Sequence, residues 1–213
     1  MKTHTNTANA WRAFQPSPES IKIGIDNGMT GAAFAIHSGG WTWNQFKPRA
    51  KVAFNDPFSV VDASSLANWL STLPLGEIEV LIEAPAMNQG KYSTAIAIAS
   101  TAASFAVLTN CVLAHNPSAL IHVCPAVTWQ KFFWSATKKT VAKPSIAMAQ
   151  TIFNHDFIPA GCRTPKDGIT DAAMMAYLLT KPELRLKLIH DLAKSREDKI
   201  KRQKKTKAPK TEL

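Results

Sequence analysis

The chain has 213 residues, 46% of them hydrophobic, which is enough for one well-packed domain. Its net charge of +10 favours a polyanionic partner, most commonly nucleic acid, and a net +6 of that charge falls in residues 194–213. No apolar run reaches the roughly 18 clean residues of a membrane span, and the polar residues 1–19 do not resemble a signal peptide, so we expect neither.

The first regular element is expected in residues 21–36, which read IKIGIDNGMTGAAFAI. Two apolar runs around Asn27-Gly28 predict a β-hairpin, with Asn-Gly supplying the positive φ of a tight turn. The isoleucines of the first run set the register of one buried face, so Asp26 should point to the other face. If helices cover both faces, that carboxylate is buried, which is costly without a cation or a hydrogen-bonding partner. Asp before Asn-Gly is also a common turn residue, and that alternative stays open.

Beyond the hairpin, strand and helix patterns alternate. Three antiparallel strands followed by parallel strands and helices predict a mixed five-stranded α/β sheet flanked by helices. We expect a flexible arm (1–19), one α/β domain (20–181) and a basic C-terminal tail (182–213). The expected elements are a third strand with one buried face (41–46), helices (58–73, 93–113, 125–134, 144–153 and 167–179) and two short buried strands (79–83 and 119–123).

Three more carboxylates are placed to meet Asp26. Glu83 ends the apolar run EVLIE, a central strand expected beside the first strand, and open α/β sheets place their sites at strand carboxyl ends. Asp167 and Asp171 are four residues apart, so they share one face of the last core helix. Asp167 also suits a helix N-cap. Asp171 lies beside the apolar face, where an isolated carboxylate should take up a proton or a cation.

Four converging carboxylates in a basic protein would repel one another strongly without metal. Oxygen-only ligands favour Mg²⁺, with Mn²⁺ as a substitute, over zinc. Two such ions about 4 Å apart are the usual device for phosphodiester hydrolysis. The predicted catalytic and metal-binding residues, with two ions per active site, are Asp26, Glu83, Asp167 and Asp171.

The segments IGIDNGMTGAAFAI, VLIEAP and KDGITDAAMMAYLL, in this order and at these separations, resemble the RuvC-type Holliday-junction resolvases of the RNase H-like nuclease superfamily, in a phage- or virus-like form. The resemblance covers roughly residues 20–180. It implies an RNase H-like fold, with Asp26 and Glu83 as the first two catalytic acids and Asp171 as the last. It also implies a homodimer that cuts two opposed strands of a four-way junction symmetrically, leaving 5′-phosphate and 3′-hydroxyl nicks.

Two positions depart from the family pattern. Bacterial members usually carry proline where this chain has Asn27. Many bacterial members place the last two acids three residues apart, but this chain has Gly168 three residues before Asp171. Its acid lies four residues before Asp171, at Asp167, as it often does in viral and phage relatives. The small-residue helix 93–113 follows the second acid and is the expected subunit contact.

Several polar residues are candidates for DNA contact. Three of them, at positions 89–92, follow the second acid in a loop. Three lysines, at positions 138–143, occupy the region where the family has DNA-contacting lysines. Lys166 precedes the last acidic motif. An ordinary solvated loop is the alternative for each of them. These candidates are Gln89, Lys91, Tyr92, Lys138, Lys139, Lys143 and Lys166.

Other functions remain open. The same acids would serve an RNase H-like nuclease acting on flaps, other branched DNA or RNA–DNA hybrids. An actin-like or sugar-kinase-like ATPase shares the hairpin pattern but needs a second domain and a second Gly-rich motif. A non-catalytic DNA-binding module would have no use for clustered acids. We expect no small-molecule cofactor. The cysteines Cys111, Cys124 and Cys162 predict reduced, mostly buried thiols in a cytosolic protein. The resemblance implies a cytoplasmic, nucleoid-associated protein of DNA recombination and repair.

Overall fold

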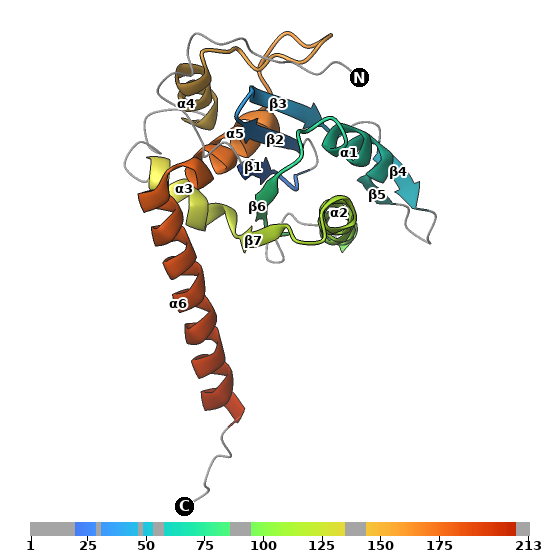
Figure 1. Ribbon diagram of the computed structural model, residues 1–213. Helices are drawn as coiled ribbons and strands as arrows, with labels where there is room; N and C mark the ends of the chain where they lie inside the picture. Colours follow the sequence, from blue (N-terminus) through green and yellow to red (C-terminus); the bar gives the residue numbers. More distant parts are fainter. Residues whose placement is uncertain are drawn as a thin grey trace, which may run out of the picture.

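The computed structural model describes residues 20–28, 31–46, 49–52, 58–85, 95–134 and 144–207. Its centre is a five-stranded sheet with the order β3-β2-β1-β6-β7 (Figure 1). The first three strands are antiparallel, whereas β6 runs parallel to β1 and β7 parallel to β6. The predicted fold class, a mixed five-stranded α/β sheet flanked by helices, is confirmed. The strands are β1 (Ser20–Ile25), β2 (Ala32–His37), β3 (Gly40–Gln45), β6 (Glu77–Glu83) and β7 (Leu120–Cys124).

Helices cover both faces of this sheet, and the alternation of side chains in β1 separates two cores. Ile21, Ile23 and Ile25 pack with Leu66 and Leu108 on one side. This side is covered by α1 (Ala63–Leu70) and α2 (Ala95–His115). The opposite side is covered by α5 (Asp167–Thr180), which lies across β1 and β2. Two further helices, α3 (Ala126–Trp134) and α4 (Pro144–Phe153), complete that second core.

The core beneath α5 is rich in aromatic rings. Phe34 of β2 stacks on Trp41 of β3 at a centroid distance of 5.4 Å and meets Phe153 of α4 edge-on at 5.0 Å. These rings contribute large buried area and preferred pair geometries. They fix α4 and α5 against the sheet, and α5 carries two of the predicted acids.

Residues 58–73 do not form the single predicted helix. Phe58–Val61 is strand β5, which pairs antiparallel with β4 (Arg49–Val52) in a separate two-stranded sheet. The consecutive valines at 60 and 61 favour extended backbone. The helix begins only after Asp62, whose carboxylate accepts a hydrogen bond from the Ser64 amide at 3.0 Å and acts as the N-cap.

Strand β3 was expected to bury one face, but both faces are covered. Thr42 and Asn44 are buried on the side opposite Trp41 and Trp43. The Trp69 indole of α1 lies 3.4 Å from the Thr42 hydroxyl, so α1 shields a strand whose polar residues suggested exposure to solvent. Polar residues at alternating positions therefore misled the prediction, because short polar side chains can be buried when they find partners.

Helix α2 packs two serines, as well as Leu108 and Val112, against the neighbouring elements. Ser104 accepts a hydrogen bond from the Val61 amide at 3.2 Å, and Ser100 donates to the Ser59 carbonyl oxygen. By length and composition alone, α2 is apolar enough to cross a membrane, and no other helix in the described ranges is. The core helices of soluble proteins often pass the same test. Its expected role as a subunit contact stays a prediction.

The last helix, α6 (Pro182–Lys207), follows α5 directly and extends well beyond the body of the molecule (Figure 1). Leu188 is fully buried, and Leu184 and Leu192 pack against the core, so the first turns of α6 belong to the folded body. The three cysteines are free thiols, as expected, but only Cys124 is buried. The predicted arm 1–19 lies outside the described residues.

Candidate active site

Two neighbouring strands present their acids on the same face and at the same end. The parallel register pairs Gly24 with Leu81 and Ile25 with Ile82, so Asp26 and Glu83 occupy the next position of the two strands. Asp26 follows the end of β1, and Glu83 is the last residue of β6. Side chains alternate along both strands, so these two carboxylates point toward α5. The sequence predicted this juxtaposition at the carboxyl ends of the strands.

Asp26 lies at the centre of the acidic cluster. Its residue is only 8% exposed, and the Gly28 amide donates to its Oδ1 at 3.0 Å. Burial raises the pKa of Asp26 well above 3.8, and the charges of Glu83, Asp171 and Asp167 raise it further, against the lowering effect of the Gly28 amide. The other three predicted acids therefore all act electrostatically on Asp26. A buried carboxyl among three others resists ionisation unless a cation joins the cluster.

The connection between β1 and β2 differs from the predicted tight turn. Six residues separate the two strands, and neither Asn27 nor Gly28 has a positive φ. The Asp26 amide donates to the Ala32 carbonyl at 3.0 Å, which closes a wider loop. Gly31 has no positive φ, but its position has no room for a side chain. A Cβ there would lie 2.2 Å from the Asp26 carbonyl oxygen. Asn27 reaches in the other direction and donates to the Thr101 carbonyl of α2 at 3.0 Å.

Glu83 has a partner that the sequence did not assign to the site. The indole Nε1 of Trp129, which is fully buried in α3, donates to Glu83 Oε2 at 3.1 Å. Burial raises the pKa of Glu83, and the Trp129 hydrogen bond lowers it. Trp129 lies in an aromatic-rich helix, and helical spacing of aromatic residues carries no signal for such a bond.

Cys124 lies beside Glu83 in the register of β7. Its burial, followed by the charge of Glu83, raises the pKa of the thiol to about 12. At neutral pH this sulfur is a neutral thiol and contributes packing to the site. It offers no thiolate ligand for a metal ion.

The position of α5 brings the last two acids to the strand ends. Lys166 is the N-cap residue and makes no side-chain capping bond, so Asp167 occupies the first helical turn and is not the N-cap that the sequence also allowed. In the first turn an acid is still favoured by the helix dipole. Asp171 follows one turn later, directly before Ala172, whose carbonyl lies against Gly24 of β1. Both acids and Lys166 are partly exposed.

The donor chemistry of the cluster suits a hard divalent cation, because all four side chains offer carboxylate oxygens. The observation in favour is the raised pKa of Asp26, because a bound cation would oppose the effects of burial and of the charges of Glu83, Asp171 and Asp167 that raise it. Within the described ranges, however, no group of three or more His, Cys, Asp or Glu side chains is arranged to hold a metal ion. The charges of the other three acids reach Asp26, but the four side chains are not arranged as a complete set of metal ligands.

Comparison with family models finds no match, and comparison with curated proteins finds none either. Among solved structures, T. thermophilus RuvC in complex with a Holliday junction substrate is 13% identical and covers 76% of this chain and 91% of its own, with a TM-score of 0.43. A second Thermus thermophilus RuvC structure is 13% identical and covers 75% and 92%, with a TM-score of 0.39. Likeness at this level concerns the fold alone and carries no conclusion about activity.

Of the predicted DNA-contacting residues, only Lys166 lies in the described part of the chain, next to Asp167 at the start of α5. The structure leaves its role untested. The other six fall outside the described residues: Gln89, Lys91, Tyr92, Lys138, Lys139 and Lys143.

Proposed function

We propose that this chain is a Mg²⁺-dependent, structure-selective endonuclease that resolves four-way DNA junctions by paired symmetric hydrolysis, leaving 5′-phosphate and 3′-hydroxyl ends. The observation that carries the proposal is the convergence of Glu83, Asp167 and Asp171 on the buried Asp26, whose pKa is raised first by burial and then by their charges. Glu83, Asp171 and Asp167 each oppose the ionisation of Asp26, so a divalent cation bound among them would stabilise the cluster.

The four acids would hold two divalent ions, as the sequence predicted. When bound, such ions lower the pKa of water and neutralise charge on the phosphate under attack. Asp26 is fixed by its own amide and by the Gly28 amide, so its carboxylate is oriented before any ligand arrives. Glu83 is oriented by the Trp129 indole. Lys166 at the start of α5 would attract a phosphate toward the acids.

The test is cleavage of a labelled synthetic four-way junction with Mg²⁺, beside a linear duplex, a flap and an RNA–DNA hybrid. Asp26→Asn should abolish cleavage while junction binding persists. Asp156→Asn is the matched control, because Asp156 is an exposed carboxylate in the loop after α4. It should cleave like the unmodified chain.

Paired symmetric nicks in the junction alone would support the resolvase. Cleavage of flaps or hybrids instead would keep the acidic site and change the substrate to that of another RNase H-like nuclease. Absence of cleavage with both Mg²⁺ and Mn²⁺ would overturn the catalytic proposal and leave a DNA-binding protein.

A further inference from the structure

Helix α6 changes character half-way along its length. Leu184, Leu188 and Leu192 recur every four residues and pack on the core, which makes one apolar stripe along the first half. The stripe stops there. From Lys194 onward every residue whose side chain is described is exposed, and Ile200 is the only large apolar residue. The second half of α6 therefore has no face for packing against its own domain.

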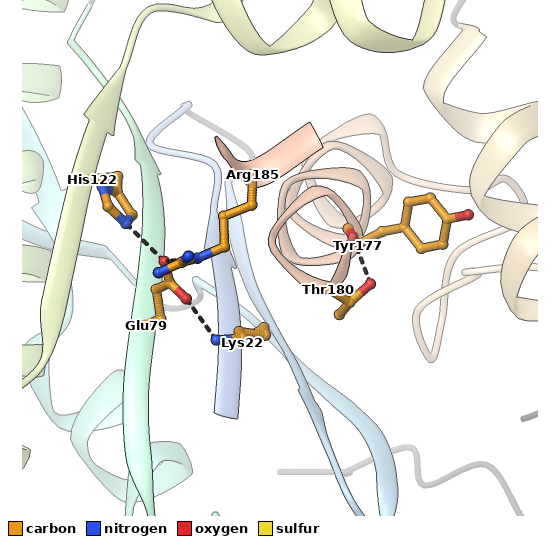
Figure 2. A network of polar contacts seen from close by, with 6 residues as sticks. All are labelled: Lys22, Glu79, His122, Tyr177, Thr180 and Arg185. Atoms are coloured by element: carbon orange, nitrogen blue, oxygen red, sulfur yellow. Dashed lines mark hydrogen bonds and ion pairs between the residues drawn. The ribbon is translucent and has the colours of Figure 1, made fainter. Parts of the chain in front are cut away.

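The first half of α6 is tied to the body by a buried charged hub. Glu79 of β6 accepts hydrogen bonds from Lys22 of β1 at 2.6 Å and from Arg185 of α6 at 2.6 Å, and His122 of β7 lies 2.9 Å away (Figure 2). Burial alone would raise the pKa of Glu79, but the bonds from His122, Lys22 and Arg185 outweigh it and lower the pKa to about 2. The hub stays ionised at every physiological pH and joins α6 to two strands.

A second set of contacts joins α6 to α3. Lys131 of α3 pairs with Asp191 of α6 at 2.7 Å, and the Lys187 ammonium lies 5.6 Å from the centre of the Phe132 ring. Both contacts are partly exposed, so each contributes only modestly to the stability of the joint. Together with the buried leucines and the Glu79 hub, they hold the start of α6 on two sides. The remainder of the helix extends from a fixed base (Figure 1).

The extended half, Lys194–Lys207, is strongly basic. It has eight Lys or Arg residues and two acids, a net +6 over fourteen residues, and residues 199–207 contain no acid. Glu197 and Asp198 each precede a basic residue by four positions, at Lys201 and Arg202, which supports the helix without an apolar face. At ~1.5 Å per residue this half is about 21 Å long. Such a helix presents a rod of positive charge.

We propose that the extended half of α6, Lys194–Lys207, is an arm that binds the phosphate backbone of duplex DNA without regard to sequence. This deepens the proposed function, on which it rests for the identity of the polyanion. Lysines dominate the arm, and they act as point charges on phosphates more than as readers of base edges. A membrane surface fits less well, because interfacial helices need an apolar face to insert and this one has only Ile200.

The basic arm would also offset the electrostatic repulsion between the acidic site and the phosphates of DNA. Asp26 and the three carboxylates around it repel a phosphodiester, and Lys166 is the lysine directly beside Asp167 at the start of α5. A basic arm fixed to the same domain raises the local concentration of DNA without touching the acids.

The test measures binding of the full chain to a fluorescent duplex in EDTA, which excludes cleavage, over a series of NaCl concentrations. The triple variant Lys194→Gln, Arg196→Gln, Lys201→Gln should weaken binding about tenfold or more near physiological salt. It should also flatten the plot of log affinity against log salt by about 0.9 for each phosphate that the arm no longer neutralises. Circular dichroism would verify that the helix persists.

Two controls make the result specific to charge on the arm. The triple variant Lys194→Arg, Arg196→Lys, Lys201→Arg keeps every charge and should bind as the unmodified chain does. Glu197→Gln with Asp198→Asn should bind more tightly. Unchanged affinity and salt slope in the Gln triple variant would overturn the proposal. So would vesicles of anionic phospholipid binding the arm when the duplex does not.

This experiment is separate from the test of catalysis. If the chain proves not to be a nuclease, the arm can still bind duplex DNA, and the salt slope will show it. If the arm does not bind, Asp26→Asn will still decide whether the acids cleave DNA.

Discussion

The backbone of Gly24 in β1 lies directly against the backbone of Ala172 in α5. A Cβ on Gly24 would lie 1.9 Å from the Ala172 carbonyl oxygen and 2.6 Å from the Ala176 amide nitrogen. Gly24 is two residues before Asp26, and Ala172 directly follows Asp171. The closest approach of strand and helix therefore sets the distance between two of the four acids.

Gly24→Ala should push α5 away from the sheet, because the atoms it would meet are backbone and cannot rotate aside. We expect a loss of about 1–3 kcal/mol in the free energy of unfolding and a larger proportional loss of cleavage, since Asp171 would move. Urea unfolding and junction cleavage measure the two effects. Gly39→Ala is the control: its Cβ would meet only the His37 side chain, at 3.2 Å, and should cost far less. Equal effects of both substitutions would contradict this account of α5.

Asp26→Asn should stabilise the metal-free protein. The folded-state pKa of Asp26 is raised above its ordinary 3.8 by burial and by Glu83, Asp171 and Asp167, so ionising it opposes folding. The unmodified chain therefore loses stability as the pH rises from 3.8 toward the folded-state pKa, and the amide avoids that loss.

Thermal unfolding in EDTA should give a higher Tm for Asp26→Asn than for the unmodified chain at pH 7, with the difference vanishing near pH 3.8 and below. Adding Mg²⁺ should raise the Tm of the unmodified chain more than that of the variant, because only a site with all four acids gains the full binding energy. A lower Tm for the variant in EDTA would contradict the buried acidic cluster.

Trp129→Phe removes the donor to Glu83 and keeps most of the ring packing. Because the indole bond lowers the pKa of Glu83 against the effect of burial, its loss should raise that pKa. The acidic limb of the pH profile for cleavage should then move to higher pH, with a loss of about tenfold on that limb. Trp134→Phe, on the same helix and in the same core, should leave the limb in place. Identical pH profiles for the two variants would show that Trp129 does not influence the pKa of Glu83.

The stabilisation that the Glu79 ion pairs give the folded protein should be lost in acid. Its pKa of about 2 in the folded protein, against 4.5 ordinarily, corresponds to about 3 kcal/mol of stability. Because the folded-state pKa is the lower of the two, this contribution is complete above pH 4.5 and is lost as the pH falls toward 2.

Glu79→Gln should therefore destabilise the protein by about 3 kcal/mol at pH 7 and by much less near pH 2. It leaves the Lys22 and Arg185 charges without their carboxylate. Urea unfolding at several pH values measures this difference. Glu77→Gln, an exposed glutamate on the same strand, should have little effect at any pH. A loss independent of pH would mean that Glu79 stabilises by packing alone.

Local patterns of residues were enough to predict the order of most elements and the candidate acids. Alternation in Ile21, Ile23 and Ile25 indicated the face of Asp26, and the short apolar run ending at Glu83 indicated a central strand, because both patterns follow directly from the two-residue repeat of a strand. The spacing of Asp167 and Asp171 placed them on one helix face. Helix α4 has the predicted bounds, Pro144–Phe153.

How these pieces meet depends on contacts between distant parts of the chain. The strand at Phe58–Val61 depends on pairing with β4, which local propensity does not specify. The Trp129 bond to Glu83, the contact of Gly24 with α5 and the hub around Glu79 join residues far apart in the chain. Such contacts depend on register, on close backbone approach and on the burial of charge. These are properties of packed elements, and no local pattern of residues encodes them.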